Sequence, residues 1–336
     1  MTLTISLVTY NGERWLPGLL QSLAAQTSRD FELLALDNAS TDASAALLRA
    51  AAAGLPHAEL IVSDINLGYA AAHNRNIRLA DGELMCLLNQ DVVLDERFVE
   101  TVIAASDVHD RGPGRLGAVQ ARVLRLGADG ERTSAIDTTG LRMLRSRRVI
   151  SRGQGTADGE RWSIPGPVWG VDGPVPVYLR AALMDVAEPS TGTADLEFLD
   201  EDFFMYKEDV DLAWRLRRRG WRTVYEPDAV AWHARTAAAG DATSLMEVAR
   251  SNATIDPWIK RVSWRNQRLM QIKNERLTDF LRDAPWILGR EIASAGFILA
   301  ADRERLAAVR DLVRLAPRAI AKRHAITGRG AVTGPD

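Results

Sequence analysis

Three carboxylates crowd the start of one predicted helix in the second half of the chain. Glu208, Asp209 and Asp211 follow the apolar residues 203–206 and precede an amphipathic stretch that ends near Gly220. A helix N-terminus attracts acids through its partial positive charge, but three exceed what a helix needs. A carboxylate with a pKa near the working pH can remove a proton from a hydroxyl group. Because like-charged neighbours raise a carboxyl pKa, we predict Asp209 as a general base, with Glu208 beside it.

A second acidic position lies in the first half of the chain. Asn89, Gln90 and Asp91 directly follow an apolar run. An acid there can hold a divalent cation, usually Mg or Mn, that bridges two phosphates, because such ions keep waters and take substrate oxygens as ligands. His233 follows another apolar run and offers a neutral ring nitrogen as a metal or diphosphate ligand. A turn-capping Asp91 and a structural His233 are the open alternatives.

Strands that alternate with helices must position these groups. We predict strands at 3–9, 31–36, 60–62 and 83–88, with helices at 13–25, 40–52 and 69–79. This alternation predicts an α/β fold with a mostly parallel sheet covered by helices. In such sheets ligands bind beyond the carboxyl ends of the strands. The residues that fall at those ends include Thr9, Tyr10, Asn11, Asp37, Asn38 and Asp91.

The remainder of the chain divides less clearly. We predict a helix at 97–108, strands at 117–123, 175–179, 222–225 and 229–233, and a polar loop at 188–197. Residues 125–165 are rich in Gly, Arg and Ser with weak periodicity, which indicates a long excursion or flexible loop. From about 246 to 323 the pattern is helical. Pro257, Pro285 and Pro317 are expected to start or break helices there.

Composition limits the class of protein. With 336 residues and 46% hydrophobic residues, the chain can bury an ordinary core. The single cysteine, Cys86, excludes an intrachain disulfide and fits a reducing compartment. We see no signal peptide and no apolar run near the ~20 residues that a membrane span requires, so we expect a cytoplasmic protein. We expect no nucleic-acid partner.

The charge is unevenly spread along the chain. Its net charge is −2, yet residues 258–330 hold 16 Lys and Arg against 7 Asp and Glu. Such a basic region suggests a phosphate-bearing partner, either anionic lipid or a diphosphate-linked acceptor. A solvated helical face is the alternative. We expect a nucleotide-sugar-binding and catalytic region at 1–240, followed by a helical, basic extension at 241–336. This extension could contact the inner face of the cell membrane peripherally, or it could form the interface of a homodimer.

Taken in order, these motifs resemble the family 2 inverting glycosyltransferases of the A-type fold, and most closely the bacterial rhamnosyltransferase-like branch. The resemblance covers roughly residues 3–275. It implies a Rossmann-like, mostly parallel sheet flanked by helices. The motifs that carry it are Val8-Thr9-Tyr10-Asn11, Asp37-Asn38-Ala39-Ser40-Thr41-Asp42, Asn66-Leu67-Gly68-Tyr69 with Asn74-Arg75, Leu88-Asn89-Gln90-Asp91, residues 204–221 around Glu208-Asp209, and His233.

The resemblance also implies a role for each matched residue. Asp209 would be the catalytic base with Glu208 beside it, Asp91 and His233 would hold the metal, and Asp172, Gly173 and Asp211 would line the acceptor side. The residues implied in binding the nucleotide sugar are Thr9, Tyr10, Asn11, Asp37, Asn38, Gly68, Asn74, Arg75, Asn89 and Gln90.

The chain departs from the family pattern at several positions. Asn89 replaces the first acid of the metal-binding Asp-x-Asp motif, and Asp172-Gly173-Pro174 stands where relatives carry Ser-Gly-Ala. His73 and Asn76 replace other common residues. The excursion at 125–165 is a candidate lid or acceptor loop. Residues 258–266 mix Trp with basic residues, which suits either a membrane-surface helix or packing on the catalytic region.

We therefore expect an enzyme that transfers a sugar, best matched to L-rhamnose from dTDP-L-rhamnose, onto a saccharide or a polyprenyl-diphosphate-linked saccharide in cell-surface polysaccharide synthesis. The alternative donor is another nucleotide hexose, such as a UDP-sugar. A sugar-1-phosphate nucleotidyltransferase would need a Gly-rich basic loop after the first strand, which Thr9-Tyr10-Asn11-Gly12-Glu13 does not provide. A non-catalytic nucleotide-sugar-binding protein is the third class.

Overall fold

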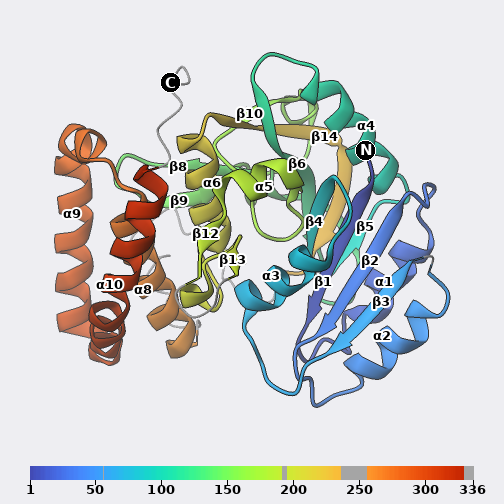
Figure 1. Ribbon diagram of the computed structural model, residues 1–336, viewed down its shortest axis with the longest axis horizontal. Coiled ribbons are helices and arrows are strands. Elements are labelled where there is room, and N and C mark those ends of the chain that lie inside the picture. Colours follow the sequence, from blue (N-terminus) through green and yellow to red (C-terminus); the bar gives the residue numbers. More distant parts are fainter. Residues whose placement is uncertain (56, 191–194, 236–255, 329–336) are drawn as a thin grey trace.

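A parallel set of strands forms one half of the central sheet. The computed structural model describes residues 1–55, 57–190, 195–235 and 256–328. The strands β3 (Ala58–Val62), β2 (Phe31–Asp37), β1 (Leu3–Thr9) and β4 (Leu84–Asn89) lie side by side in that order, all parallel (Figure 1). They are joined by α1 (Leu16–Ala24), α2 (Ser44–Ala52) and α3 (Tyr69–Leu79). The inner strands read as nearly continuous apolar runs because helices cover the sheet.

The other half of the sheet is mixed. β11 (Val177–Leu179) runs antiparallel between β4 and β6 (Arg115–Leu126), and β14 (Trp221–His233) is parallel to β6. β5 (Val92–Leu94), β7 (Arg132–Thr138) and β10 (Gly166–Val168) add antiparallel pairs at its margins. The helices α4 (Phe98–Asp110) and α5 (Arg180–Val186) complete this half. The prediction of a mostly parallel sheet flanked by helices is thus confirmed, in a mixed form.

Two predicted strands, 222–225 and 229–233, are one long strand. β14 pairs with β6 along its whole length, and the register shifts between Glu226 and Val230. Pro227 and Asp228 occupy this shift, where a β-bulge accommodates a proline that cannot donate a ladder hydrogen bond. The bulge explains why the sequence pattern is interrupted although the strand continues.

Of the two interpretations of 125–165, a long excursion agrees with the structure and a flexible loop is wrong. Beyond the end of β6, this stretch contains β7, a small hairpin of β8 (Leu141–Met143) and β9 (Val149–Ser151), and the 3-10 turn Glu160–Trp162. Ile136 and Trp162 pack with Leu124 in a small core of their own. The strands are too short and too often interrupted by glycine to show a period-2 pattern, which is why periodicity missed them.

The polar segment 188–197 is also partly ordered. Glu188–Pro189 (β12) pairs antiparallel with Leu196–Glu197 (β13). The turn between them, 191–194, lies outside the described residues. A further 3-10 turn, Glu201–Phe203, leads toward α6 (Glu208–Arg218), which carries the three acids predicted at its start.

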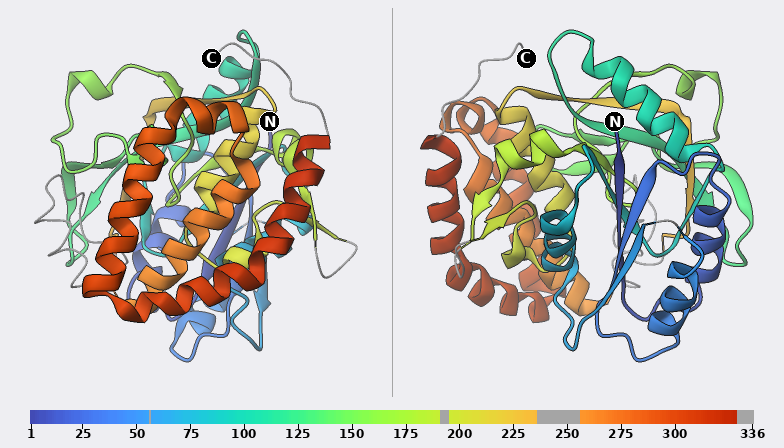
Figure 2. Two further views of the ribbon diagram at one scale, coloured as in Figure 1. Left: turned by 90° about the vertical axis from the view of Figure 1, so that its left-hand side faces the viewer. Right: turned by 45° about the vertical axis from the view of Figure 1, so that its right-hand side comes forward.

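Among the described residues, three helices follow the sheet. They are α8 (Pro257–Asn274), α9 (Leu277–Ala301) and α10 (Ala307–Gly328), with the turn Arg303–Leu306 between the last two. α8 packs against both α6 and α10, while α9 and α10 form the layer farthest from β1–β3 (Figures 1 and 2). No helix of the described chain is both long and apolar enough to cross a membrane.

Two of the three prolines do not break a helix. Pro257 begins α8 as predicted, but Pro285 and Pro317 lie inside α9 and α10. Both rings are exposed, so the carbonyl that each leaves without its helical donor lies toward solvent. The predicted division at 240/241 falls in 236–255, outside the described residues, and remains a prediction.

Candidate active site

The ends of three parallel strands bring the first group of predicted residues together. The register sets Thr9 opposite Asp37, and Val8 opposite Asn89. The Thr9 hydroxyl donates to Gln90 Oε1 at 2.6 Å, and the backbone N–H of Tyr10 donates to the same oxygen at 2.9 Å. Gln90 therefore ties the turn after β1 to the turn after β4, and both border the same edge of the sheet.

Asp37 presents an acceptor at this edge. Its carboxylate is buried, and Oδ2 accepts from the backbone N–H of Ser40 at 3.1 Å. Oδ1 has no hydrogen-bond partner among the described residues. A buried carboxylate oxygen without a donor is costly, so this atom is suited to accept a hydrogen bond from a ligand. Asn11 lies beside it, with Oδ1 accepting from the Thr41 N–H at 2.8 Å.

The start of α3 lies against the loop that leads into α6. Gly68 has a φ of 82°, and a Cβ built there would lie 2.5 Å from the ring of Phe204. Only glycine permits this approach. Asn38 holds the segment in place, because its Oδ1 accepts from the Leu67 N–H at 2.8 Å and its Nδ2 donates to Asn66 Oδ1 at 3.0 Å. Both ends of the Asn38 amide are thus used to hold residues 66–67 at this edge of the sheet.

Asn74 does not belong to a ligand site. It is fully buried, its Nδ2 donates to the Leu199 carbonyl at 2.8 Å and to Glu201 at 2.9 Å, and its Oδ1 accepts from Leu199 N–H at 2.9 Å. These contacts use the amide to hold 198–201 against α3, which corrects the predicted donor-binding role. Arg75 on the same helix has an exposed side chain, and its role remains a prediction.

His73 is likewise part of the core. Its Nδ1 lies 2.7 Å from the Ser6 hydroxyl, and burial lowers its pKa to about 3. This imidazole is therefore neutral at any physiological pH.

Asp91 and His233 come together across the β5–β14 pair. Val92 pairs with His233 in the antiparallel register, so the acid just before β5 meets the histidine at the end of β14. His233 Nε2 lies 3.4 Å from Asp91 Oδ1. The two residues are 142 positions apart in the chain, and only the sheet brings them into contact.

Asp137 is the member of this group that sequence reasoning missed. It lies on β7, is fully buried, and accepts from His233 Nδ1 at 2.8 Å. Burial alone would lower the pKa of His233, but hydrogen bonds and charge from Asp137 and Asp91 raise it to about 9. Asp137 thus orients the ring through Nδ1, while Nε2 faces the second carboxylate, Asp91. Metal-binding histidines typically have one ring nitrogen held by an acid in this way.

Two carboxyl groups at the start of α6 differ in their acidity. Burial, reinforced by the charge of Asp209, raises the pKa of Glu208 to about 8. Burial and the charge of Asp172 raise the pKa of Asp209 to about 6, while Lys207 and backbone N–H groups oppose the rise. At neutral pH Asp209 is therefore ionised and Glu208 is mainly protonated. Of the two, Asp209 is the one that can accept a proton.

The predicted acceptor-side segment borders Asp209. A Cβ at Gly173 would lie 3.4 Å from Asp209 Oδ2, so the glycine leaves space above the carboxylate. Asp172 accepts from the Gly173 N–H at 2.9 Å through Oδ1, while its buried Oδ2 has no hydrogen-bond partner among the described residues. The Tyr69 hydroxyl lies 3.5 Å from the Gly173 carbonyl. Three separate parts of the chain thus meet around the carboxylate.

The loop that presents Asp209 is strained and held from outside. Phe204, Tyr206 and Lys207 have φ values of 65°, 70° and 76°, a region that non-glycine residues seldom occupy. Asn266 on α8 is fully buried and donates through Nδ2 to the carbonyls of residues 203, 205 and 206 at 2.8–3.0 Å. The adjacent Arg265 donates to the Phe203 carbonyl at 3.0 Å. The C-terminal helices therefore position the proposed base.

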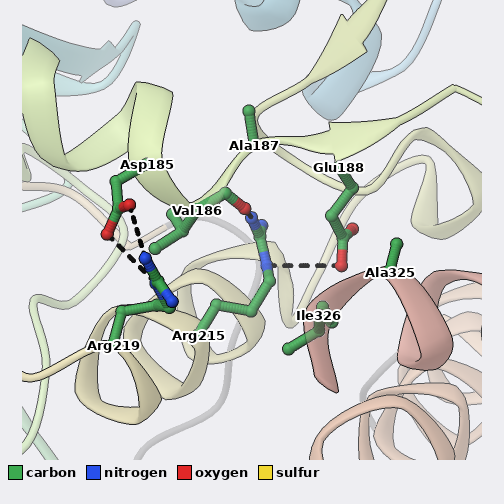
Figure 3. Close-up of a pocket in the computed structure, with 8 residues that line it drawn as sticks. All are labelled: Asp185, Val186, Ala187, Glu188, Arg215, Arg219, Ala325 and Ile326. Atoms are coloured by element: carbon green, nitrogen blue, oxygen red, sulfur yellow. Dashed lines mark hydrogen bonds and ion pairs between the residues drawn. The ribbon is translucent and has the colours of Figure 1, made fainter. Parts of the chain in front are cut away.

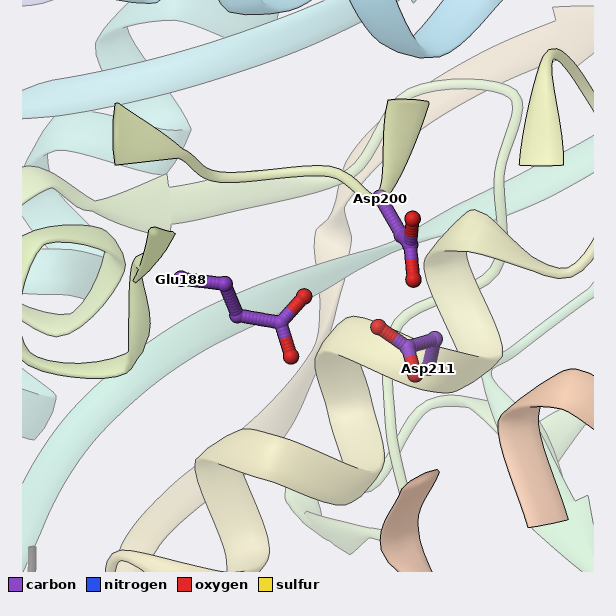
Figure 4. A group of neighbouring side chains, drawn as sticks. All are labelled: Glu188, Asp200 and Asp211. Carbon is purple, nitrogen blue, oxygen red and sulfur yellow. The ribbon is translucent and has the colours of Figure 1, made fainter. Parts of the chain in front are cut away.

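Asp211 does not line the acceptor side, which corrects the prediction. Its carboxylate is fully buried with those of Glu188 and Asp200, and all three point toward one another (Figure 4). Although these oxygens could hold a cation, the ammonium of Lys273 lies among them at 2.7–2.8 Å. Burial alone would lower the pKa of Lys273, but the carboxylates raise it. A salt-bridged lysine thus takes the place of a metal.

A small pocket lies on the far side of this cluster, between α5, α6 and the end of α10 (Figure 3). Arg219 is paired with Asp185 at 2.9 Å, and Arg215 donates to the Val186 carbonyl at 2.7 Å. Both arginines of its lining are therefore already paired within the protein, and we do not place the reaction there.

The parallel strand ends, the paired Asp91 and His233 and the carboxylate at the start of α6 define an A-type glycosyltransferase fold. The glycosyl transferase family 2 model matches residues 4–159. The chain is 30% identical over 250 residues to an N-acetylglucosaminyl-diphospho-decaprenol L-rhamnosyltransferase of Mycobacterium tuberculosis, covering 69% of this chain and 75% of the relative. The chain belongs to glycosyltransferase family 2, is similar to its rhamnosyltransferases, and is a glycosyltransferase.

Solved structures support the fold. S. aureus TarS 1–349 matches with a TM-score of 0.56 and 16% identity, covering 98% of this chain and 88% of that one. The mannosyltransferase PcManGT from Pyrobaculum calidifontis, in complex with GDP-Man and Mn²⁺, matches with a TM-score of 0.51 and 17% identity, covering 97% and 85%. At this identity the likeness concerns the fold alone.

Proposed function

We propose that this enzyme transfers L-rhamnose from dTDP-L-rhamnose, with inversion at the anomeric carbon, onto a lipid-linked saccharide in cell-surface polysaccharide synthesis. The observation that carries the mechanism is the difference between two adjacent acids. Asp209 has a pKa of about 6 and Glu208 of about 8, so of these two acids only Asp209 is ionised at neutral pH, and it faces the space above Gly173. A base whose pKa lies near the working pH is the most effective one.

The proposed reaction is a single displacement. The acceptor hydroxyl gives its proton to Asp209 as its oxygen forms a bond to the anomeric carbon of the donor. The bond from that carbon to the diphosphate oxygen breaks, and its electron pair leaves with the nucleoside diphosphate. Glu208 stays protonated in this scheme, so it adds no second negative charge at the moment when Asp209 must be ionised.

The donor would lie along the strand ends. Asp37 Oδ1 is a buried acceptor that suits a nucleobase N–H or a ribose hydroxyl. Thr9, Tyr10, Asn11, Asn89 and Gln90 would line the same edge, and Gly68 would let backbone approach the ligand.

A divalent metal, Mg or Mn, would be held by Asp91 and His233. The observation that favours this fit is His233 itself, whose Nδ1 is bound by the buried Asp137 while Nε2 faces Asp91. Solved neighbours carry Mn²⁺ with GDP-Man or with UDP and GalNAc. When bound, the metal neutralises charge on the leaving diphosphate.

The donor sugar and the acceptor are inferred from the relative. Its name specifies rhamnosyl transfer to N-acetylglucosaminyl-diphospho-decaprenol, so we propose a polyprenyl-diphosphate-linked saccharide acceptor here. A UDP-hexose is the alternative donor, because TarS is known in complex with UDP-GlcNAc. The proposal places the enzyme on the cytoplasmic side of the membrane, where such an acceptor would be exposed to a nucleotide sugar.

The test is ligand-observed NMR with a panel of nucleotide sugars, with Mg or Mn present and then chelated. Selective, metal-dependent binding of dTDP-L-rhamnose supports the proposal. Preference for a UDP-hexose keeps the enzyme class and replaces the donor. Failure to bind any nucleotide sugar, combined with no transfer in the presence of acceptor, favours a non-catalytic binding protein instead.

A further inference from the structure

The outer side of α9 carries an exposed apolar surface. Leu277, Leu281, Leu288, Ile292 and Leu299 have exposed fractions between 50% and 72%. Their spacings of four and seven residues place them within about 60° of one another around a helix that turns about 100° per residue. Trp286 and Phe297 are also exposed, but the same 100° per residue puts them on the opposite side of the helix from this row. We call the five aliphatic residues of the row the α9 apolar face. Isolated exposed leucines are ordinary, but a continuous apolar face indicates a binding surface.

The inner side of α9 is attached through polar contacts instead. Asp283 accepts from Arg145 and Arg147 at 2.8 Å, and Ser294 accepts from the Trp264 indole at 3.2 Å. Glu291 pairs with Arg268. A helix that only covered the protein would place its leucines inward and its charges outward. α9 buries Ile287 and Ile298 on its inner side together with these polar contacts, while the leucines of the α9 apolar face stay exposed.

α10 adds positive charge on the same side of the molecule. Arg310, Arg314 and Arg318 are exposed at intervals of four, beside the exposed Val309 and Val313. Figure 2 shows α9 and α10 together on one side of the molecule, the side away from β1–β3.

Arg318 is paired with Asp202 at 2.8 Å, but no exposed acid in the described part of the two helices offsets Arg310 and Arg314. No described acid on α9 or α10 belongs to the exposed class. Each is half-buried or buried and is paired with an arginine: Asp279, Asp283, Glu291 and Asp311.

We propose that the α9 apolar face and the arginines of α10 dock on an anionic phospholipid bilayer. Apolar side chains would enter the boundary between headgroups and acyl chains, and the arginines would meet lipid phosphates. The alternative of a second copy is disfavoured by charge, because a two-fold interface over this side would bring the arginines of both copies together. This inference rests on the proposed function, in which the acceptor is lipid-linked.

The proposed docking side lies within the basic extension predicted from sequence, but not at residues 258–266. Residues 258–266 were a candidate membrane-surface helix, but Val262, Arg265 and Asn266 are buried. They pack inward and hold the loop before Asp209. α8 therefore lies between the proposed membrane-docking side and the loop before Asp209, and we do not propose that α8 itself contacts the membrane.

The experiment is co-sedimentation of the full chain with phosphatidylcholine vesicles, with and without phosphatidylglycerol. We expect binding that requires the anionic lipid and weakens with salt. L288E/I292E should reduce it by at least about tenfold, because two apolar side chains no longer enter the bilayer. V108E alters an equally exposed apolar residue on α4 and should leave binding unchanged. R310Q/R314Q/R318Q should remove the preference for anionic lipid.

Absence of binding to anionic vesicles by the unmodified chain overturns the inference. So does equal binding by L288E/I292E, or a concentration-dependent dimer that this variant abolishes while no vesicle binds. If L288E/I292E fails to fold, L281E with L299E on the same row provides the comparison. Nucleotide-sugar binding, measured without lipid, tests the proposed function separately, so either idea can fail alone.

Discussion

His233 Nδ1 lies 2.8 Å from a carboxylate oxygen of Asp137, a fully buried acid on a strand that sequence patterns did not reveal. This contact fixes which ring nitrogen faces Asp91. It also accounts for much of the rise in the pKa of His233 to about 9. Asp137 is therefore a positioning residue for the proposed metal site, since it acts through His233 and makes no described contact with Asp91.

We expect D137N to weaken Mn²⁺ binding by about tenfold to a hundredfold, the usual cost of losing a carboxylate behind a metal-binding histidine. The measurement is the free Mn²⁺ concentration by electron paramagnetic resonance, in the presence of nucleoside diphosphate. D158N removes a half-buried acid that is paired with Arg122 of β6 and serves as the control. Equal Mn²⁺ affinity in D137N and D158N would show that Asp137 does not support a metal site.

D209N should lower kcat by about a hundredfold to ten-thousandfold while donor binding is retained, because it removes the proposed base and little else. E208Q should cost far less, since Gln mimics the protonated acid that Glu208 is at neutral pH. The measurement is the rate of sugar transfer at pH 7.5. A larger loss in E208Q than in D209N would exchange the two roles.

The pH profile should respond to Asp172. If Asp209 is the base, kcat falls as pH drops through about 6, where the carboxylate becomes protonated. The negative charge of Asp172 raises this pKa, so D172N should lower it and move the acidic limb to lower pH. A limb that stays in place in D172N would mean that another group titrates there.

N266A should lower kcat by about tenfold to a hundredfold with an unchanged KM for the donor, because the strained loop loses the donor that holds three of its carbonyls. Q267A is the matched control. Gln267 is buried on the same helix but donates to the Arg147 carbonyl instead, at 2.9 Å. Since both variants remove a buried amide, thermal unfolding should shift in both. Equal kcat losses would assign Asn266 a purely structural role.

Several predictions from sequence were close because the signal is local. The helix predicted at 69–79 is α3 with the same bounds, and the strand predicted at 3–9 is β1. Apolar periodicity and a glycine start are properties of neighbouring residues, so they survive without knowledge of the fold. The positions of Thr9, Asp37 and Asn89 at one edge then follow, because parallel strands end together.

Other residues were misassigned because a residue of the same motif can either face the ligand site or be buried in the core. Asn74 and Asp211 stand in motifs of the family, yet both side chains are buried, Asn74 against 198–201 and Asp211 with Lys273. Nothing in the local sequence tells which face of α3 or α6 meets the site. The partners lie 125 and 62 residues away along the chain, so only packing decides the matter.

The sequence alone determined the fold class, the alternation of strands and helices, the family and the short list of acids, because these depend on residue type and on spacing within single elements. The tertiary structure decided which of those acids do chemistry. It brings Asp137 into contact with His233 and places Asp172 beside Asp209. It also places the Asn266 amide of α8 where it donates to the backbone carbonyls of the loop before Asp209. A carboxyl pKa depends on burial and on charges a few ångströms away, and those neighbours come from distant parts of the chain.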